Sequence, residues 1–288
     1  MKVCIIGSED SWHGGRLLAA FNRYGVLTQT VSPGRLRAQI GGSPAVGSLG
    51  VPMDDADFVL VRDIPIGSLE QIIFRMDALH VLEAMGVRVV NPPRSIERAV
   101  DKYLTSKLLE LHGVSTPATI VTESMDEALE CVQQWGQAII KPLFGGGGKG
   151  MVRVEGIEVA SRVFRALQLG RYVYYLQEYV DHGIEDIRSF IIDGRVVAAM
   201  IRRGSSWKTN VTQGATPIPY VPDAEVVALS IQAAQAIGTF YAGVDLLRDV
   251  EGRLCVLEVN SMPGWRGLQQ TTAVDIAQAL VDALLASD

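Results

Sequence analysis

The sequence predicts an α/β part followed by an α+β part, in a chain of 288 residues that allows two or three domains. Short apolar β runs alternate with helical segments over the first 90 residues. This alternation is typical of a parallel sheet covered by helices. In the last third, β runs flank Asp193-Gly194 and a turn that contains Gly252. These pairs indicate two antiparallel hairpins.

The elements of the first domain, residues 1–95, follow from apolar periodicity and from glycines that end helices. Strands are expected at residues 3–7, 58–61 and 87–90, and helices at residues 12–24 and 72–85. The Gly/Pro/Ser-rich segment 41–52 is predicted to be a mobile surface loop. Asn91-Pro92-Pro93 closes the domain, because consecutive prolines cannot continue a helix.

Two further units are predicted, at residues 96–176 and 177–288. The first combines helical segments 95–111 and 125–135 with strands 118–122, 138–142 and 151–154. The second follows a β run at 172–180 and contains strands 187–192, 196–202, 241–247 and 254–259, with a helix at 223–237. Asp223 is the predicted N-cap of that helix, since its carboxylate can accept a first-turn N–H.

The composition excludes several classes of protein. A net charge of −6 argues against a chain whose main partner is nucleic acid or an anionic membrane. No apolar run approaches the roughly 18 residues of a membrane span, and the N-terminal apolar run is too short for a signal peptide. The cysteines, Cys4, Cys131 and Cys255, lie far apart without metal-like spacing, which favours a cytoplasmic setting.

A glycine run at residues 145–150 lies between two predicted strands. Without Cβ atoms, Gly146, Gly147 and Gly148 can bring backbone N–H groups against a phosphate. A Walker A loop is excluded, because Leu143 stands where that motif needs glycine. A dinucleotide fingerprint fits the spacing but should open a helix. The run is therefore predicted to be a flap over nucleotide phosphates, with a flexible surface loop as the alternative.

Two lysines are candidates for phosphate binding. Lys141 ends an apolar run, where a cation is costly unless its ammonium reaches water or an anion. Its place just before the glycine run favours a phosphate, and a lysine reaching solvent at a strand end is the alternative. Lys102 follows Asp101 near a helix start, which by itself is typical of a solvated pair.

The acidic residues near the last hairpin predict a metal site. Period 2 puts Glu258 and Asn260 on one face of their strand. If the turn centres between residues 250 and 251, Asp245 pairs with Val256 and shares that face, although a one-residue slip would break this arrangement. Two carboxylates and an amide oxygen suit Mg²⁺, whose shell phosphate oxygens can complete. Unrelated strand-end charges are disfavoured, because an unpaired Asp245 in an apolar strand is expensive.

Other polar residues give weaker signals. Backbone groups around Glu178 could bind an adenine edge while its carboxylate accepts from ribose hydroxyls. Charges gather at both ends of the hairpin around Asp193-Gly194, at Asp186, Arg188, Arg202 and Arg203. The histidines show no metal spacing and no nucleophile motif is present, so covalent nucleophilic catalysis has no support.

Taken in order, these motifs resemble the ATP-grasp superfamily. The motifs are Asp101-Lys102, Lys141-Pro142 with its glycine flap, Gln177-Glu178-Tyr179, Asp186-Ile187-Arg188, Val244-Asp245-Leu246 and Glu258-Val259-Asn260. Within that superfamily the chain is similar to the RimK-like amino-acid ligases, which add α-linked glutamate to a protein tail or to a coenzyme. The resemblance covers residues 97–288 and implies an ATP-grasp fold preceded by a small Rossmann-like α/β domain at residues 1–95.

The resemblance implies a mechanism and a role for each site residue. A carboxylate attacks the γ-phosphate of ATP, and an amine then attacks the resulting acylphosphate to form an amide, ADP and phosphate. By this pattern phosphates bind Lys102 and Lys141, adenosine binds Glu178 and Tyr179, and the nucleotide site also includes Asp186, Lys208 and Asn210. Asp245, Glu258 and Asn260 would ligate Mg²⁺, for which Mn²⁺ could substitute, and Arg202 or Arg203 would stabilise the acylphosphate.

Two departures bear on the acceptor. Residues 211–215 read Val-Thr-Gln-Gly-Ala, where members that modify a ribosomal protein carry a basic residue and two glycines. Residues 260–268 are instead similar to members that act on pterin or deazaflavin coenzymes. Trp265 offers a flat face to an acceptor ring and Arg266 a partner for a carboxylate, with Arg188 as a further substrate residue. The alternative for Trp265 is packing at the domain interface.

The sequence therefore predicts an ATP- and Mg²⁺-dependent ligase that joins L-glutamate to a glutamyl-bearing small coenzyme. The partners expected are the small acceptor, L-glutamate and further copies of the chain in a homo-oligomer, with no nucleic acid and no membrane. Ligation to a protein C-terminus or a carrier protein is an alternative. A non-catalytic ATP-binding regulatory protein is another, disfavoured by the complete acidic set.

Overall fold

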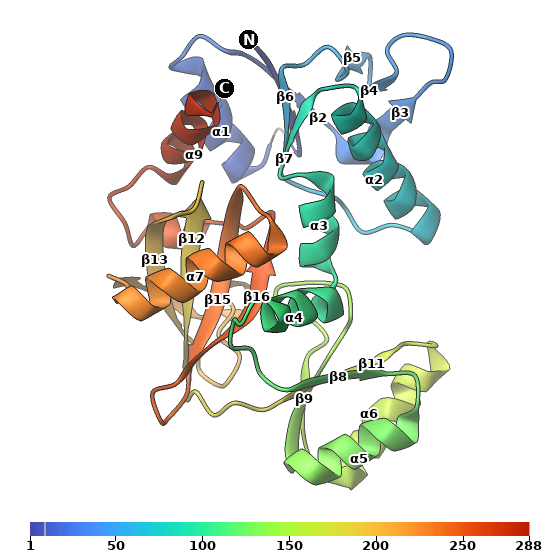
Figure 1. Ribbon diagram of the computed structural model, residues 1–288, viewed down its shortest axis with the longest axis vertical. Coiled ribbons are helices and arrows are strands. Elements are labelled where there is room, and N and C mark those ends of the chain that lie inside the picture. Colours follow the sequence, from blue (N-terminus) through green and yellow to red (C-terminus); the bar gives the residue numbers. More distant parts are fainter. Residues whose placement is uncertain (9, 288) are drawn as a thin grey trace.

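The computed structural model describes residues 1–8 and 10–287 and divides the chain into three stacked parts (Figure 1). In Figure 1 a parallel sheet lies at the top, a five-stranded antiparallel sheet in the middle and a four-stranded antiparallel sheet at the bottom. Both chain termini lie at the top, where the last helix packs beside the first.

The N-terminal sheet has the strand order β2-β1-β6-β7, and its strand pairs are parallel. Its elements are β1 (Lys2–Ile6), α1 (Trp12–Asn22), β2 (Leu27–Val31), β6 (Phe58–Val61), α2 (Leu69–Ala84) and β7 (Arg88–Val90). Alternate residues of β1 and β6 face opposite sides, so the apolar side chains of these strands pack against α1 on one face and against α2 on the other. Ser11 caps α1 by accepting from Gly14 N at 2.9 Å.

The central part begins with two helices and continues into the small sheet. Its elements are α3 (Pro93–Val100), α4 (Lys102–Leu111), β8 (Thr119–Thr122), α5 (Met125–Trp135), β9 (Gln137–Lys141), β10 (Val152–Glu155), α6 (Ile157–Leu169) and β11 (Tyr174–Glu178). The strand order is β10-β9-β11-β8. Helices α5 and α6 cover one face through buried Val132 and Phe164, which leaves the other face toward the middle of the molecule.

The C-terminal sheet has the order β14-β13-β12-β15-β16. Its elements are β12 (Glu185–Ile192), β13 (Arg195–Arg203), β14 (Thr216–Tyr220), α7 (Ala224–Ile237), β15 (Tyr241–Arg248) and β16 (Leu254–Asn260), followed by α8 (Arg266–Gln269) and α9 (Ile276–Ala286). Helix α7 covers one face of this sheet through Val226, Ala233 and Ile237. Asp223 is its N-cap, as predicted, and accepts from Val226 N at 2.9 Å.

Several element predictions are confirmed. The parallel N-terminal sheet is present, α5 spans the predicted residues, and β12 and β13 form the hairpin around Asp193-Gly194. Asp193 and Gly194 have φ angles of 47° and 69°. This is the left-handed turn conformation that Asp-Gly pairs favour, and it was the basis of the hairpin prediction. Strands β2 and β14 and helices α6 and α9 are among the elements that were not predicted from the sequence.

Two predictions about local structure are wrong. Segment 41–52 is not a simple surface loop, because β4 (Val46–Ser48) pairs with β3 (Leu36–Ala38) and β5 (Val51–Pro52) in a three-stranded sheet. Val46 is buried in the core under α2 and anchors this sheet. The helical segment 95–111 is two helices, because Asp101 is extended and its carboxylate caps α4 at Leu104 N.

Among the helices of residues 1–8 and 10–287, none combines the length and the apolar character that a bilayer span requires.

Candidate active site

A pocket lies between the central and C-terminal sheets, and both sheets contribute charged side chains to it. Its predicted site residues are Lys141, Gly148, Glu178, Tyr179, Asp186, Arg202, Lys208, Asn210, Asp245 and Glu258. Residues from five of the six motifs therefore meet in one cavity. The predicted residues that do not line it are Lys102, Gly146, Gly147, Arg188, Arg203, Asn260, Trp265 and Arg266.

Strands β15 and β16 bring the predicted metal ligands together, although the predicted register is wrong. Asp245 lies opposite Glu258, not opposite Val256, because a bulge follows Asp245 and leaves Leu257 unpaired. Residues directly opposite each other in an antiparallel pair share a face. The bulge therefore places both carboxylates side by side, with Asn260 next along the same face of β16.

The donor set at this position fits Mg²⁺. Asp245 is 3% exposed, and its buried Oδ1 accepts no hydrogen bond but lies 2.5 Å from Arg188 Nε in an ion pair. The side-chain Nδ2 of Asn260 donates to the carbonyl of Gly243 at 3.4 Å, a contact in which the amide oxygen takes no part. Loss of water around Glu258, with Asp245 beside it, raises the pKa of Glu258. A divalent cation would relieve this repulsion. Within the described part of the chain no group of three His, Cys, Asp or Glu side chains could hold a metal, so phosphate oxygens would have to complete the shell.

Two arginines compensate the buried carboxylates. Arg202 binds Asp186 through Nε and Nη2, at 2.6 and 2.5 Å, and its Nη2 lies 3.0 Å from Asp245 Oδ2. Arg188 Nε lies 2.5 Å from Asp245 Oδ1. Burial opposes the charged form of Arg202, but Asp245 and Asp186 outweigh it and raise the pKa of Arg202. The guanidinium therefore stays charged inside the pocket.

The alternation of β13 separates Arg202 from Arg203. Arg203 is exposed, lies on the opposite face of the strand and pairs with Glu185. Of the two arginines predicted as alternatives for the acylphosphate, only Arg202 lines the pocket. Thr209, which the sequence analysis missed, donates to Asp186 Oδ2 at 2.5 Å, so both oxygens of Asp186 are engaged.

Lysine side chains bind the glycine flap and the neighbouring strand. Lys102 Nζ donates to the carbonyls of Leu143 and Gly145, at 3.3 and 2.7 Å, and lies against the flap. Lys208 Nζ donates to the carbonyl of Met151 at 2.9 Å. Thr212 donates to the carbonyl of Gly147 at 3.2 Å. The flap and the residue after it are therefore held by Lys102 of α4 and by the segment 208–213.

Glycine is required at the tip of the flap. Gly148 has a φ of 71°, and a Cβ there would lie 2.3 Å from Asn210 Oδ1. A side chain at this position would therefore be strained by the positive φ and would displace the Asn210 side chain.

Lys141 occupies the end of β9 as predicted. Its Nζ donates to Gln177 Oε1 at 2.5 Å, and Gln177 is a buried residue that the sequence analysis did not assign to Lys141. Burial lowers the pKa of Lys141 to about 8. A bound anion would restore the charged form.

Glu178, Tyr179, His182 and Trp207 also line the pocket. Glu178 is exposed at the end of β11, and Arg153 lies over the Tyr179 ring at 3.8 Å from its centroid. Trp207 and His182 were not among the predicted site residues, because both lie in irregular loops whose path no local pattern predicts.

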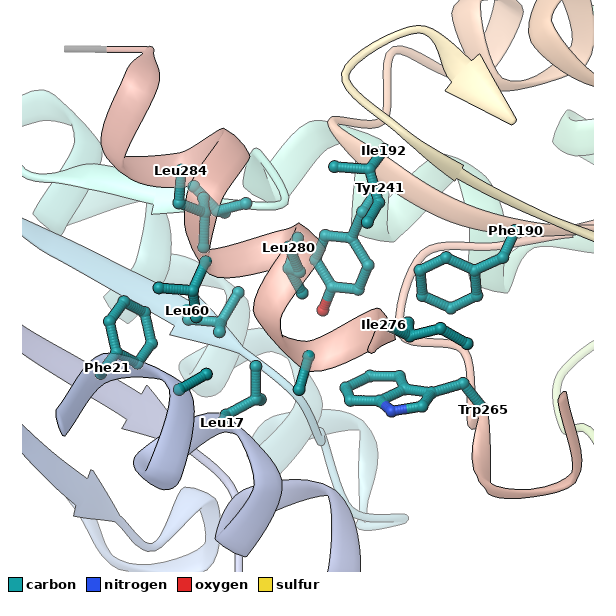
Figure 2. Close-up of a cluster of buried hydrophobic side chains, with 14 of the residues drawn as sticks. Leu17, Phe21, Leu60, Phe190, Ile192, Tyr241, Trp265, Ile276, Leu280 and Leu284 are labelled. Carbon is teal, nitrogen blue, oxygen red and sulfur yellow. The ribbon is translucent and has the colours of Figure 1, made fainter. Parts of the chain in front are cut away.

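The structure gives Trp265 the packing role and not the predicted stacking role. The indole is 1% exposed, at 5.7 Å from the Phe190 ring and 4.6 Å from the His13 ring. Figure 2 shows it beside Ile276 of α9 within the hydrophobic cluster. Neither face is open to an acceptor ring, so the stacking prediction is wrong. Arg266, the next residue, is exposed and free to meet a carboxylate.

Replacing Trp265 with alanine is expected to destabilise the protein by about 3–5 kcal/mol, because it empties a large buried volume. Replacement with phenylalanine should cost less, since most of the apolar contact area remains. Urea unfolding of both variants measures the difference. Equal stability of wild type and the alanine variant would contradict the packing role.

Known proteins match this chain over nearly its whole length. The model of the RimK-like ATP-grasp domain matches residues 99–284. A tetrahydromethanopterin:α-L-glutamate ligase of Methanocaldococcus jannaschii is 35% identical over 99% of this chain and 98% of its own length. The ligase of the same name from Methanococcus maripaludis is 33% identical over 99% of this chain and 98% of its own length.

Solved structures show the same fold. The ATP-grasp ligase PsnB with its minimal precursor has a TM-score of 0.79 at 22% identity, covering 99% of both chains. A RimK domain ATP-grasp protein from Sphaerobacter thermophilus has a TM-score of 0.78 at 19% identity, covering 98% of this chain and 99% of that one. The predicted ATP-grasp fold is confirmed. The chain belongs to the RimK-like ATP-grasp family, whose members are ADP-forming carboxylate–amine ligases.

Proposed function

We propose that the protein is an ATP- and Mg²⁺-dependent ligase that joins L-glutamate to a glutamyl-bearing small coenzyme. The observation that carries this proposal is the pocket itself. Lysines and the glycine flap border it on the side of β9, and Asp245 and Glu258 face it from β15 and β16. Cations for phosphates and oxygen ligands for a metal therefore share one cavity under a flap.

The reaction consists of two displacements. An acceptor carboxylate oxygen attacks the γ-phosphorus of ATP, the bond to the β-phosphate oxygen breaks, and ADP leaves. The amine nitrogen of glutamate then attacks the acyl carbon, the bond to phosphate breaks, and the nitrogen loses a proton as the amide forms. When bound, Mg²⁺ neutralises charge on the β,γ-phosphates.

Each proposed role rests on where the chain holds the side chain. Lys141, at the strand end, and Lys102, beneath the flap, neutralise phosphate charge. Arg202, whose Nε and Nη2 bind Asp186, offers its remaining Nη1 to the transferred phosphoryl group. The backbone of Gly146, Gly147 and Gly148 covers the phosphates and excludes water.

The nucleoside end and the metal complete the proposed site. Glu178, Tyr179, Lys208 and Asn210 line the pocket and would bind the nucleoside. Asp186 contributes to nucleotide binding by holding Arg202, and Arg188 holds Asp245 in place for the metal. Mn²⁺ also prefers oxygen ligands, and it is expected to substitute for Mg²⁺ at Asp245, Glu258 and Asn260.

The proposed acceptor follows from the relatives, which are named for tetrahydromethanopterin. Arg266 is exposed six residues after Asn260 and can bind an acceptor carboxylate near the metal site. The three free cysteines agree with a cytoplasmic setting. The homo-oligomer stays a prediction.

Hydroxylamine trapping tests the ligase directly. Hydroxylamine added with ATP, Mg²⁺ and tetrahydromethanopterin, in the absence of glutamate, should yield a hydroxamate together with ADP, because it captures the acylphosphate. Omitting the acceptor should abolish both products. Tight ATP binding with no ADP release under any of these conditions would support a regulatory protein instead.

A further inference from the structure

The junction between the N-terminal domain and the loop after the metal ligands is built around one arginine. Arg62 directly follows β6, and its Nη2 donates to the carbonyl of Pro263 at 2.7 Å. Its guanidinium carbon lies 4.4 Å from the centroid of the Trp265 ring. Arg62 therefore contacts residues 261–266, here called the acceptor loop, through both a hydrogen bond and a cation–π contact.

The other end of the Arg62 guanidinium is fixed within the fold. Its Nη1 donates to the hydroxyl of Tyr241 at 3.0 Å, and that hydroxyl donates to the carbonyl of Val61 at 2.7 Å. Figure 2 shows the Tyr241 hydroxyl pointing from the C-terminal sheet toward the N-terminal domain. The guanidinium is thus held at one edge and presents the other edge to the acceptor loop.

Charge compensation does not explain this arginine. Among the residues that the structure describes, no carboxylate forms an ion pair with Arg62, and its buried Nε has no hydrogen-bond partner. A half-buried cation without an acidic partner is costly. The planar shape of its donors, which a lysine lacks, is the property that the junction uses.

His13 holds the same loop from the first turn of α1. The backbone N–H of Trp265 donates to His13 Nε2 at 3.0 Å. Burial, with Arg62 and Arg266 nearby, lowers the pKa of His13 to about 4. The ring therefore stays neutral and keeps its acceptor nitrogen toward the loop. Two groups of the N-terminal domain thus fix Pro263 and Trp265, on either side of Gly264.

We propose that Arg62 is a positioning residue for acceptor use: by fixing Pro263 and Trp265 to the N-terminal domain, it holds Arg266 at the site where the acceptor carboxylate binds. This role rests on the proposed function, because it needs an acceptor near Arg266. ATP binds on the other side of the metal ligands, against β9 and the flap. Arg62 should therefore affect the acceptor and leave ATP nearly untouched.

The test is steady-state kinetics of Arg62→Gln and Arg62→Lys with tetrahydromethanopterin as the varied acceptor. For Arg62→Gln, kcat/KM for the acceptor is expected to fall about 10- to 100-fold, the scale of a misplaced binding group. The KM for ATP should stay within about twofold. The loss of kcat/KM for the acceptor should be smaller in Arg62→Lys, because an ammonium can still reach the carbonyl of Pro263.

The matched control is Arg23→Gln. Arg23 joins α1 to α9 by donating to Gln278 at 2.6 Å, so the same substitution loosens the same pair of domains without touching the acceptor loop. Its acceptor kinetics should match the wild type. Thermal unfolding of all variants accompanies the kinetics.

Two outcomes would overturn the role of Arg62. One is a lower unfolding temperature with unchanged acceptor kinetics in both Arg62 variants, which would make Arg62 a structural brace. The other is an equal loss of kcat/KM for ATP and for the acceptor. A wild-type protein that releases no ADP would overturn the proposed function and this role together, whereas an active wild type with unaffected Arg62 variants would overturn this role alone.

Discussion

Replacing Glu258 by glutamine is expected to lower kcat by about 10²- to 10³-fold while leaving the fold intact, the scale for removing one group that stabilises transition-state charge. Glu258 lies opposite Asp245, and a metal between them would hold the β,γ-phosphates. Glutamine keeps the size of the side chain and loses its charge. Quench-flow or steady-state release of ADP at saturating substrates measures the effect.

The same variant should be at least as stable as the wild type without metal. Burial and the neighbouring Asp245 raise the pKa of Glu258 in the folded protein. An acid whose pKa is raised on folding destabilises the fold once pH exceeds its unfolded pKa, so removing the charge relieves repulsion at pH 7. Mg²⁺ with ADP should raise the unfolding temperature of the wild type and not that of the variant.

The control for this variant is Asp249→Asn, a carboxylate of the turn after β15 that pairs with Arg253. Its turnover should match the wild type. Asp245→Asn should also lose turnover, but it leaves Arg188 without its charged partner and Arg202 with Asp186 alone, so it should cost stability as well. Wild-type turnover in the Glu258 variant would show that the metal lies elsewhere.

Replacing Lys141 by methionine is expected to lower kcat/KM for ATP by about 10²- to 10³-fold, because the variant leaves phosphate charge without a cation at the end of β9. Methionine keeps the aliphatic stem that packs in the strand. Lys149→Met, an exposed lysine of the flap, is the matched control and should keep wild-type kinetics.

The pH dependence checks the same role. The pKa of Lys141 is about 8 because the side chain is buried. As pH rises from 7 to 9 the ammonium loses its proton, so the apparent affinity of the wild type for ATP should fall. Lys141→Arg keeps its charge over this range and should lose that dependence. A wild-type affinity for ATP that is flat between these pH values would place the phosphates away from Lys141.

Much of the fold could be predicted from local patterns. The parallel N-terminal strands, helix α5 and the Asp193-Gly194 hairpin were predicted correctly. In each, the apolar period or the turn residues favour a single kind of element. Helix α6 was missed although it has an amphipathic sequence between Gly156 and Gly170. Segment 41–52 was wrongly predicted to be a surface loop, because its glycines and prolines are typical of loops. The burial of Val46 in this segment depends on helix α2, which lies elsewhere in the sequence.

The candidate site shows the same division. The residue types and their order along the chain predicted the family, because phosphoryl transfer from ATP uses all three features together. These are lysines that bind phosphate, a glycine flap and paired carboxylates that bind a metal. Register was beyond local patterns: the bulge after Asp245, and not the predicted pairing with Val256, brings Asp245 opposite Glu258. Strand alternation predicts that Arg202 and Arg203 lie on opposite faces of β13. Only the structure shows which of these faces meets the pocket.

The sequence by itself therefore determined the chemistry that this protein can perform, since charges, glycines and oxygen ligands are properties of residues. Only the tertiary structure decided which of these residues meet and which are buried. Trp265 looked like a binding face because its neighbours in sequence are functional, yet α1, β12 and α9 enclose it. The physical reason is that burial depends on segments more than 70 residues away, such as Phe190 and His13, whose contacts with Trp265 no local pattern encodes.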